Sequence, residues 1–527
     1  MPSHADPVTA ARTRGPWPVR VAGVAAVAVF LALVARFWHP VWGLTAFVQL
    51  DSSYDHKKIA AFHTQPVYVY RDTGPYDGVA YSQIAYDPLL GSGELRTAVD
   101  NLAYRARRIL LPALAWAFAG GDPGRIVQAY SLLNVGAWLV LAALLWGLLA
   151  VDDVHGWLAW IGVLFSAGAL ASVRESLTDL PALTLLAAAM VAVERGRRGW
   201  AVGWLAAAGL TRETVLAALP GIGTRPWVSW ANARRALIVL APLAAWVGYI
   251  HFRVGPAGQG WSNFNWPVAG FVEKWRAALA AMVHPPSDST LAWTTLLATG
   301  GLTAQAVFLL RRPQIAEAWW RIGAIFAGMM LLLGTPVWEG YPGAAFRVLL
   351  PMTLAFFVLA RRRRASLAWL LAGGLTVFSG LVSLRDVPLD LREIAGTRHG
   401  GDACIVRLAD GWFDREQSGR HRWAWSQGGA RLEIEAWPFA ERTWRLECSL
   451  RSLAPRLVTI SQDGRELWRG AVGAEKRAVI VPFRAANGGA ALEFSTDEPA
   501  ALENETSHAR RIAFELYDPR VVLTNSP

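Results

Sequence analysis

The sequence has few cysteines and few charged residues. Only Cys404 and Cys448 occur among 527 residues, so the chain is no disulfide-dense scaffold. A single disulfide between them is possible if their region lies outside the cytoplasm. Charged residues make up 17% of the chain, whereas soluble domains usually carry about 25%. The hydrophobic share is 54% and the mean hydropathy is above zero. We therefore expect an integral membrane protein.

The sequence also lacks a basic patch on any soluble part, although its formal net charge is +11. Much of the positive charge stands in short links between apolar runs, which the positive-inside rule explains better than a nucleic-acid surface does. No cleavable signal peptide is evident, because the first apolar run, residues 19–38, is too long and lacks a clear cleavage site. We expect membrane lipids as partners, and no nucleic acid.

Apolar runs of spanning length recur up to residue 385. Since a spanning helix needs about 20 apolar residues, we predict an all-α polytopic bundle of about ten spans plus a re-entrant helix pair. Residues 109–119 are too short to cross and are expected to form an interfacial helix. Residues 200–222, interrupted by Arg212 and Glu213, are expected to enter and return as two half-helices. The candidate spans are residues 19–38, 126–151, 157–173, 177–193, 236–251, 291–310, 319–337, 346–360 and 367–384.

The arginine clusters set the orientation. Arg12, Arg14 and Arg20 place the N-terminus in the cytoplasm, and the later clusters then face the cytoplasm too. Asp152 and Asp153 fall on the same side, against expectation, but acidic residues carry little topological weight. The arginine- and alanine-rich composition indicates a bacterium, so we expect a multi-pass protein of the bacterial inner (plasma) membrane. Its polar loops would face the periplasmic or extracellular side: residues 40–108, 174–179, 212–213, 252–289, 338–347 and everything after 385.

The character of the sequence changes after residue 385. Short alternating stretches such as RLEIEAW and AVIVPF, separated by turn residues, predict an all-β sandwich. We therefore expect a cytoplasmic tail over 1–18, a transmembrane domain over 19–385 with its first outer loop at 39–125, and an extracytoplasmic sandwich over 386–527. Its tryptophans, Trp412, Trp423 and Trp425, favour carbohydrate binding or a packed core, and the sequence leaves both open.

The first outer loop carries the best candidates for chemistry. Asp77 lies in Gly-Pro-Tyr-Asp-Gly, shortly before the interfacial helix. A carboxylate there is placed to act as a general base, within reach of a lipid-linked donor and a polar acceptor. The last four residues of this pentapeptide, Pro-Tyr-Asp-Gly, are also good turn chemistry, and Asp51 is the alternative base. Arg107 and Arg108 begin the interfacial helix, where they are expected to grip lipid phosphates.

Further ionisable residues stand at predicted membrane depth or span ends. Arg212 and Glu213 interrupt an apolar segment, so they form either a functional pair or a structural ion pair. Arg347 begins a span after a polar loop and either binds a lipid phosphate or anchors the helix. Arg174 and Glu175 have a similar position.

Metal chemistry has no strong motif in this sequence. The three histidines of the first outer loop, His39, His56 and His63, have no metal-binding spacing. We predict no metal site and no cofactor, while a divalent cation is not excluded.

Several of these motifs together resemble a known family. Asp77-Gly78-x-x-Tyr81-x-x-Ile84-Ala85, preceded by Asp51-Ser52 and followed by a segment that begins Tyr104-Arg105, resembles the first luminal loop of GT-C class membrane glycosyltransferases. The nearest likeness is to the glycosylphosphatidylinositol mannosyltransferase II group and its bacterial relatives. Gly78 departs from that group, as does the C-terminal sandwich. The likeness extends over residues 20–385 and includes Arg174-Glu175-Ser176, Leu210-Thr211-Arg212-Glu213-Thr214 and Phe346-Arg347-Val348-Leu349-Leu350-Pro351.

The resemblance implies a reaction. Enzymes of this class move a hexosyl or pentosyl unit from a polyprenyl-phosphate carrier to a glycan or lipid acceptor, with a loop aspartate as base. Arginine suits the departing phosphate because its guanidinium offers a bidentate fork. The resemblance makes Asp77 and Asp51 the catalytic candidates. The substrate-binding candidates are Tyr81, Tyr104, Arg107, Arg108, Arg174, Glu175, Arg212, Glu213 and Arg347.

Two other functions remain open from the sequence. A transporter or flippase of lipid-linked glycan predicts polar residues that face both sides of the membrane, linked through the bundle. A non-catalytic glycan-binding scaffold predicts a bundle without a pocket beside Asp77.

Overall fold

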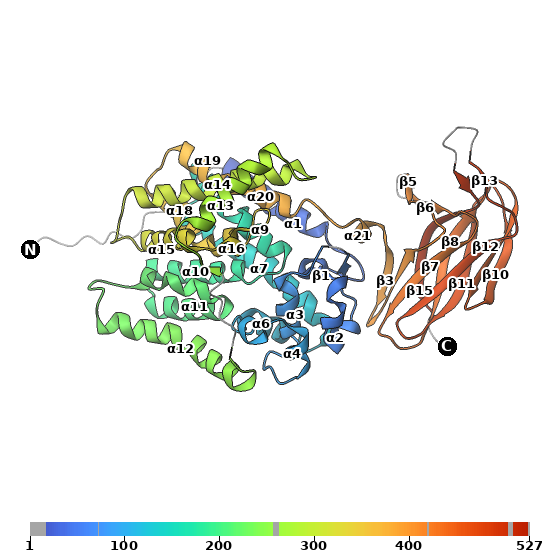
Figure 1. Ribbon diagram of the computed structural model, residues 1–527, viewed down its shortest axis with the longest axis horizontal. Helices are drawn as coiled ribbons and strands as arrows, with labels where there is room; N and C mark the ends of the chain where they lie inside the picture. Colours follow the sequence, from blue (N-terminus) through green and yellow to red (C-terminus); the bar gives the residue numbers. More distant parts are fainter. Residues whose placement is uncertain (1–16, 72, 257–262, 419–420, 504–509, 525–527) are drawn as a thin grey trace, which may run out of the picture. The chain divides into compact units, whose positions relative to one another are not determined.

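The chain folds into a helical unit and a unit made mainly of strands. The computed structural model describes residues 17–71, 73–256, 263–418, 421–503 and 510–524. The first unit contains residues 1–36, 47–57 and 69–386, and most of the helices in Figure 1 belong to it. The second contains residues 387–527 together with 37–46 and 58–68, two pieces of the predicted first outer loop.

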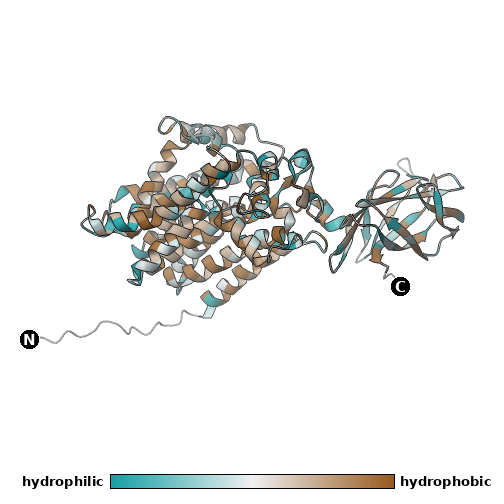
Figure 2. Ribbon diagram, turned by 90° about the horizontal axis from the view of Figure 1, so that it is seen from below, coloured by the Kyte–Doolittle hydropathy of each residue, from teal (hydrophilic) through white to brown (hydrophobic). Residues whose placement is uncertain are grey.

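Polar caps mark where the long apolar helices of the first unit begin. Asp122 accepts a hydrogen bond from the Gly124 N–H at 2.9 Å, and Pro123 occupies the first position of α7. Asp288 accepts from the Thr290 N–H at the start of α14, and such caps satisfy amides that the helix leaves unpaired. Figure 2 shows the apolar colouring along these helices. The α-helices of this unit are α1 (Trp17–Ala35), α3 (Asp77–Ile84), α4 (Glu94–Ala98), α5 (Leu102–Arg105), α6 (Leu110–Phe118), α7 (Pro123–Leu148), α8 (Val154–Leu164), α9 (Ala167–Arg174), α10 (Asp179–Glu194), α11 (Arg198–Thr211), α12 (Trp230–Arg253), α13 (Ala269–Val283), α14 (Ser289–Arg311), α15 (Ala318–Leu332), α16 (Thr335–Trp338), α17 (Ala345–Val348), α18 (Leu350–Arg362), α19 (Leu367–Gly374) and α20 (Thr376–Ser383).

Fewer helices reach spanning length than the sequence predicts. Within the described residues, α1, α7, α12 and α14 are long and apolar enough to cross a membrane, and α8 with α9 makes a fifth if that bent pair is one span. Several apolar helices of this length are expected of a multi-pass membrane protein. The predicted count of about ten spans is not confirmed, because the other apolar segments form helices that are shorter or interrupted.

The break between α8 and α9 packs closely against another helix. The two helices meet at an angle of 43°. Gly380 of α20 lies against this break so closely that a Cβ atom there would fall 2.1 Å from the Phe165 carbonyl oxygen. The carbonyls at the break therefore face another helix and not lipid, which is the condition under which irregular backbone is tolerated at membrane depth.

The segment 200–222 is divided where the sequence predicts. Helix α11 ends at Thr211, Arg212 has extended backbone, and the 3-10 helix η3 (Glu213–Ile222) follows. The two pieces pack against each other. The short helix α6 also falls within the segment expected to be interfacial.

Ion pairs join the helix ends that the sequence assigns to the cytoplasm. Arg361, near the end of α18, lies 2.5 Å from Asp152 and 2.9 Å from Asp153, the two acids of the turn between α7 and α8. Arg362 pairs with Glu194 of α10 and with Glu317 just before α15. Asp152 and Asp153, the two acids that the positive-inside rule does not explain, are therefore partners of Arg361.

In the described part of the second unit there are two large antiparallel sheets and the short antiparallel pair of β13 (Ala501–Leu502) and β14 (Arg511–Ile512). The strand orders of the two large sheets are β10-β9-β12-β7-β4-β3 and β11-β8-β15-β6-β5. Alternate residues of β11 and β8 are buried, which is the period of two that half-buried strands require. The strands of the two large sheets are β3 (Ala395–His399), β4 (Asp402–Leu408), β5 (Glu416–Ser418), β6 (His421–Trp425), β7 (Ala430–Trp437), β8 (Arg442–Arg451), β9 (Arg456–Gln462), β10 (Arg465–Val472), β11 (Arg477–Ala485), β12 (Gly489–Thr496) and β15 (Glu515–Leu523), preceded by the short helix α21 (Leu389–Glu393).

Side chains from both sheets form one core in this unit. Trp444, Leu446 and Val481 of one sheet and Leu432 and Ile460 of the other are fully buried. Both cysteines are free: Cys404 lies on β4 and Cys448 on β8, each buried in this core. Trp412 also belongs to the core, so packing accounts for this tryptophan.

Candidate active site

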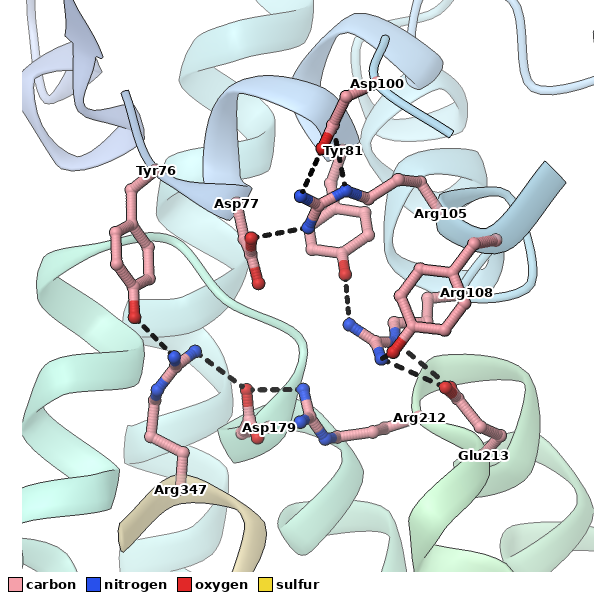
Figure 3. A network of polar contacts seen from close by, with 11 residues as sticks. Tyr76, Asp77, Tyr81, Asp100, Arg105, Arg108, Asp179, Arg212, Glu213 and Arg347 are labelled. Atoms are coloured by element: carbon pink, nitrogen blue, oxygen red, sulfur yellow. Dashed lines mark hydrogen bonds and ion pairs between the residues drawn. The ribbon is translucent and has the colours of Figure 1, made fainter. Parts of the chain in front are cut away.

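Asp77 stands at the first position of α3, where the positive end of a helix favours a negative charge. Its Oδ1 accepts a hydrogen bond from Arg105 Nη1 at 2.5 Å, and no described residue donates to its Oδ2. Figure 3 shows this second oxygen directed away from Arg105. Burial alone would raise the pKa of the carboxyl, but Arg105 and Arg347 outweigh burial and lower it. Asp77 is therefore a charged carboxylate with one unused acceptor.

Gly78 allows α3 to approach its neighbours closely. A Cβ atom at this position would lie 2.4 Å from the Glu175 carbonyl oxygen and 3.0 Å from that of Val48. Both atoms belong to the backbone, so neither can move aside as a side chain would. Gly78 thus has a steric reason to lack a side chain.

Gly78→Ala is expected to lower the free energy of unfolding by about 1–3 kcal/mol, because overpacking against fixed atoms costs this much. The measurement is thermal unfolding of the purified protein in detergent. Gly93→Ala is the matched control, since nothing lies within 4 Å of its Cβ position and its backbone is helical. Equal stability of the two variants would contradict the close approach.

Arg105 links Asp77 to a second carboxylate. Its Nε and Nη2 donate to the two oxygens of Asp100 at 3.2 and 3.1 Å, while its Nη1 serves Asp77. Asn101, at the start of α5, caps this helix by accepting from the Tyr104 N–H. The guanidinium is thereby held between two acids and orients the Asp77 side chain.

Arg108 is buried and makes a bidentate ion pair with Glu213. Its Nε and Nη2 each lie 3.0 Å from an oxygen of that carboxylate. It also donates to the hydroxyls of Tyr81 and Tyr104. The sequence left an ion pair between Arg212 and Glu213 open as one alternative, whereas in the structure Glu213 pairs with Arg108 across 105 residues of sequence.

Asp179 joins the two other arginines of the cluster. Its Oδ2 lies 2.9 Å from Arg212 Nη1 and 3.7 Å from Arg347 Nη1, and its side chain is 1% exposed. Arg347 also donates to the Tyr76 hydroxyl at 2.5 Å and lies over the Tyr76 ring. Figure 3 shows Arg347, Asp179 and Arg212 opposite Asp77 and Arg105, while Tyr76 reaches toward Arg347 from beside Asp77.

Glu175 and Arg174 lie just beside this cluster. Arg174 Nη2 donates to the Tyr70 hydroxyl at 2.8 Å and does not line the cavity described below. Burial raises the pKa of the Glu175 carboxyl to about 7, although Arg347 and Arg174 act in the opposite direction. Folding therefore raises the proton affinity of Glu175, and its contribution to stability falls as the pH rises toward 7.

Asp51 is buried away from these groups, and its acceptors are used by the local backbone. It accepts from the Ser53, Thr73 and Gly74 amides at 2.9–3.1 Å, and also from the Ser53 and Thr73 hydroxyls. Burial would raise its pKa, but these hydrogen bonds lower it to about 2. This environment suits a residue that holds the loop beside the short parallel pair β1 (Leu50–Asp51) and β2 (Val69–Tyr70).

A cavity of about 810 Å³ opens beside Asp77. Five arginines and two carboxylates supply its charged lining, so the lining is net positive by three charges (five minus two), while one wall is apolar. The charged residues are Asp77, Arg105, Arg107, Arg108, Arg212, Glu213 and Arg347, and the apolar wall includes Phe264, Met329, Leu333, Val337 and Val348.

Arg107 differs from the other four arginines of the cavity. The others each pair with a carboxylate. Among the described residues, Arg107 makes no ion pair, and its guanidinium only lies over the Tyr104 ring at 5.7 Å. Such a group is free to bind an anionic ligand.

Four members of the cluster are not among the candidates from the sequence: Tyr76, Asp100, Arg105 and Asp179. Arg105 lies in the arginine-rich run before the predicted interfacial helix, and Asp179 lies at the end of the predicted outer loop 174–179. No spacing signal points to Tyr76 or Asp100, because their roles arise from contacts across the fold. Within the described ranges no three His, Cys, Asp or Glu side chains come together as a metal site.

Comparisons with known proteins give distant structural likenesses. No family model and no curated protein matches the sequence. The apo crystal structure of ArnT from Cupriavidus metallidurans has a TM-score of 0.29 and 14% identity, over 69% of this chain and 78% of that one. The cryo-EM structure of the arabinosyltransferase EmbB from Mycobacterium smegmatis has a TM-score of 0.23 and 11% identity, over 98% of this chain and 66% of that one. These values do not assign the chain to a family, and the function is argued from its own site.

Proposed function

We propose that this protein is a glycosyltransferase that moves a sugar from a polyprenyl-phosphate carrier to a glycan or lipid acceptor outside the cytoplasm of a bacterium. The observation that carries the proposal is that a carboxylate with a free oxygen, Asp77, and an arginine without an acidic partner, Arg107, line the same cavity. The cavity belongs to a unit of apolar helices, the part of the protein that would lie beside a lipid-linked substrate.

The reaction requires one bond to form and one to break. The acceptor oxygen attacks the anomeric carbon of the sugar, and the bond from that carbon to the phosphate oxygen breaks. Asp77 Oδ2 takes the acceptor's proton, and the polyprenyl phosphate leaves with the bonding electrons. The lowered pKa of Asp77 keeps it ionised and ready to accept a proton at neutral pH.

The arginines stabilise the leaving group in this scheme. Arg107 is the first contact for the lipid phosphate, because Arg107 can bind the phosphate without breaking an ion pair. Arg347 and Arg212 then neutralise the charge that develops as the bond breaks, which is the largest contribution expected in such a site. Tyr76 holds the Arg347 guanidinium through a hydrogen bond and a ring contact.

Transfer of radiolabelled sugar from polyprenyl-phosphate donors to membrane glycans tests the proposal. The protein is purified and reconstituted into proteoliposomes, with protein-free liposomes as the blank. Label in the acceptor fraction supports the transferase. Absence of transfer from every donor, together with passage of lipid-linked glycan across the bilayer, would favour a transporter instead.

Arg107→Gln is expected to raise the KM for the lipid-linked donor about ten- to a hundredfold and to change kcat less, because a lost contact of this strength weakens binding by about 1.5–3 kcal/mol. Its melting temperature should equal that of the wild type, since Arg107 pairs with no carboxylate. Initial rates over a range of donor concentration measure both constants. Arg125→Gln, at an exposed arginine outside the cavity, is the control, and an unchanged KM in Arg107→Gln would contradict the role.

A further inference from the structure

A second cavity lies entirely within the strand-rich unit. Its volume is about 460 Å³, and it is bordered by the end of α21, the start of β3, and strands β6 and β15. Its lining residues all belong to the second unit, so it is separate from the cavity at Asp77. The volume exceeds what packing defects leave in a protein interior and has the size of a small-molecule site.

The charged lining of this cavity is predominantly basic. Four arginines line it, against two acids, Glu393 and Asp518. Asp518 is already engaged, because its oxygens accept from His421 Nδ1 and from the Arg422 amide, both at 2.9 Å. His39 adds no charge at neutral pH, since burial lowers its pKa. The arginines are Arg392, Arg415, Arg422 and Arg520.

Arg415 is the unusual member of this set. Its side chain is half-buried, yet the guanidinium makes no hydrogen bond or ion pair with any described residue. Burial lowers its pKa, although Glu393 acts in the opposite direction. A partly desolvated guanidinium without a partner binds an oxyanion more favourably than an arginine that is already paired.

The rest of the lining is apolar and includes one oriented aromatic ring. Trp423 is fixed by a hydrogen bond from its Nε1 to Glu416 at 3.1 Å and by stacking against Tyr517. Leu391, Leu408 and Val521 add aliphatic surface. A ligand that fits this lining has an oxyanion for the arginines and C–H surface for the ring and the aliphatic side chains. Sugars combine these features when they carry an acidic group.

From these contacts we infer that the cavity between α21, β3, β6 and β15 is a binding site for an acidic saccharide, a sugar unit that carries a carboxylate or phosphate group, with Arg415 as its main anion contact. The inference does not require the transfer reaction, because none of its residues lies in the first unit.

Isothermal titration calorimetry of the full chain in detergent tests this site. The probes are digalacturonate, its neutral counterpart galactobiose, galactose 6-phosphate and inorganic phosphate. We expect at least one of the acidic sugars to bind at least tenfold more tightly than galactobiose and than inorganic phosphate. The stronger of the two acidic sugars identifies the oxyanion as carboxylate or phosphate.

Arg415→Gln is expected to weaken that binding at least tenfold without changing the melting temperature, because no described contact is lost. Arg469→Gln, at an exposed arginine of β10 outside the cavity, should bind as the wild type does. Equal affinity for acidic and neutral sugars, no binding of either acidic sugar, or an unchanged affinity in Arg415→Gln would overturn the inference. Inorganic phosphate that binds as tightly as the acidic sugars would also overturn it, since the site would then recognise a simple anion.

Discussion

Asp77→Asn is expected to lower sugar transfer by about a hundred- to ten-thousand-fold, because a general base contributes this much to a step that transfers a proton. Asparagine has nearly the same shape, but its amide cannot take the acceptor's proton. The protein should remain folded, since Arg105 keeps the Asp100 carboxylate as a partner at 3.1 Å. Initial rates of transfer in proteoliposomes and a melting curve of the same preparation measure the two effects separately.

Asp100→Asn is the matched control for this variant. It removes the other carboxylate of Arg105, but the Asp100 side chain is 53% exposed and lies outside the lining of the cavity. We expect it to retain most of the activity. If both variants lose transfer to the same extent, the position of Arg105 is what matters, and Asp77 is not the base.

Arg347→Gln is expected to reduce kcat by about a hundred- to a thousand-fold, the usual result of removing one donor that stabilises charge in a transition state. Arg347→Lys should recover part of the loss, because an ammonium group keeps the charge but cannot form the planar fork. Asp179 keeps its closer ion pair with Arg212 at 2.9 Å, so neither variant leaves a buried acid without a partner. Rates at saturating donor measure kcat directly.

The competing role for Arg347 is a structural anchor at the membrane interface. If Arg347 is an anchor, Arg347→Gln lowers the melting temperature and leaves kcat unchanged. If it stabilises the phosphate, the variant lowers kcat and leaves the melting temperature unchanged. Tyr76→Phe separates the two further, because it removes only the hydroxyl that accepts from Arg347 Nη2. A modest loss of kcat in Tyr76→Phe, with normal stability, indicates that the tyrosine positions the guanidinium.

Periodicity in the sequence located the strands and the long helices well. The stretch RLEIEAW forms β7, with its Leu and Ile side chains buried and its Arg and first Glu exposed. The number of spans was not predictable in the same way, because several predicted spans form helices that are shorter or interrupted. The break at Phe165, for example, packs against Gly380, a residue more than 200 positions away along the chain.

The candidate site followed from the sequence only in its types of residue. Asp77, Arg107, Arg108, Arg212, Glu213 and Arg347 all line one cavity. Their pairing did not follow, since neighbours in sequence suggested Arg212 with Glu213. In the structure, Glu213 instead forms an ion pair with Arg108, and Arg212 forms one with Asp179. Such choices depend on how helices pack, which local spacing does not encode.

Among the described residues, four of the five arginines that line the cavity are already paired with carboxylates, and Arg107 is the exception. An anion that reaches beyond Arg107 must compete with the carboxylates held at 2.5–3.0 Å by Arg105, Arg108 and Arg212. A phosphate on a long lipid has the additional energy of its hydrocarbon chain, about 0.8 kcal/mol for each buried CH₂ group, with which to offset that competition. Under the proposed function, the carboxylates would therefore favour a phosphate that arrives on a lipid over inorganic phosphate at the paired arginines.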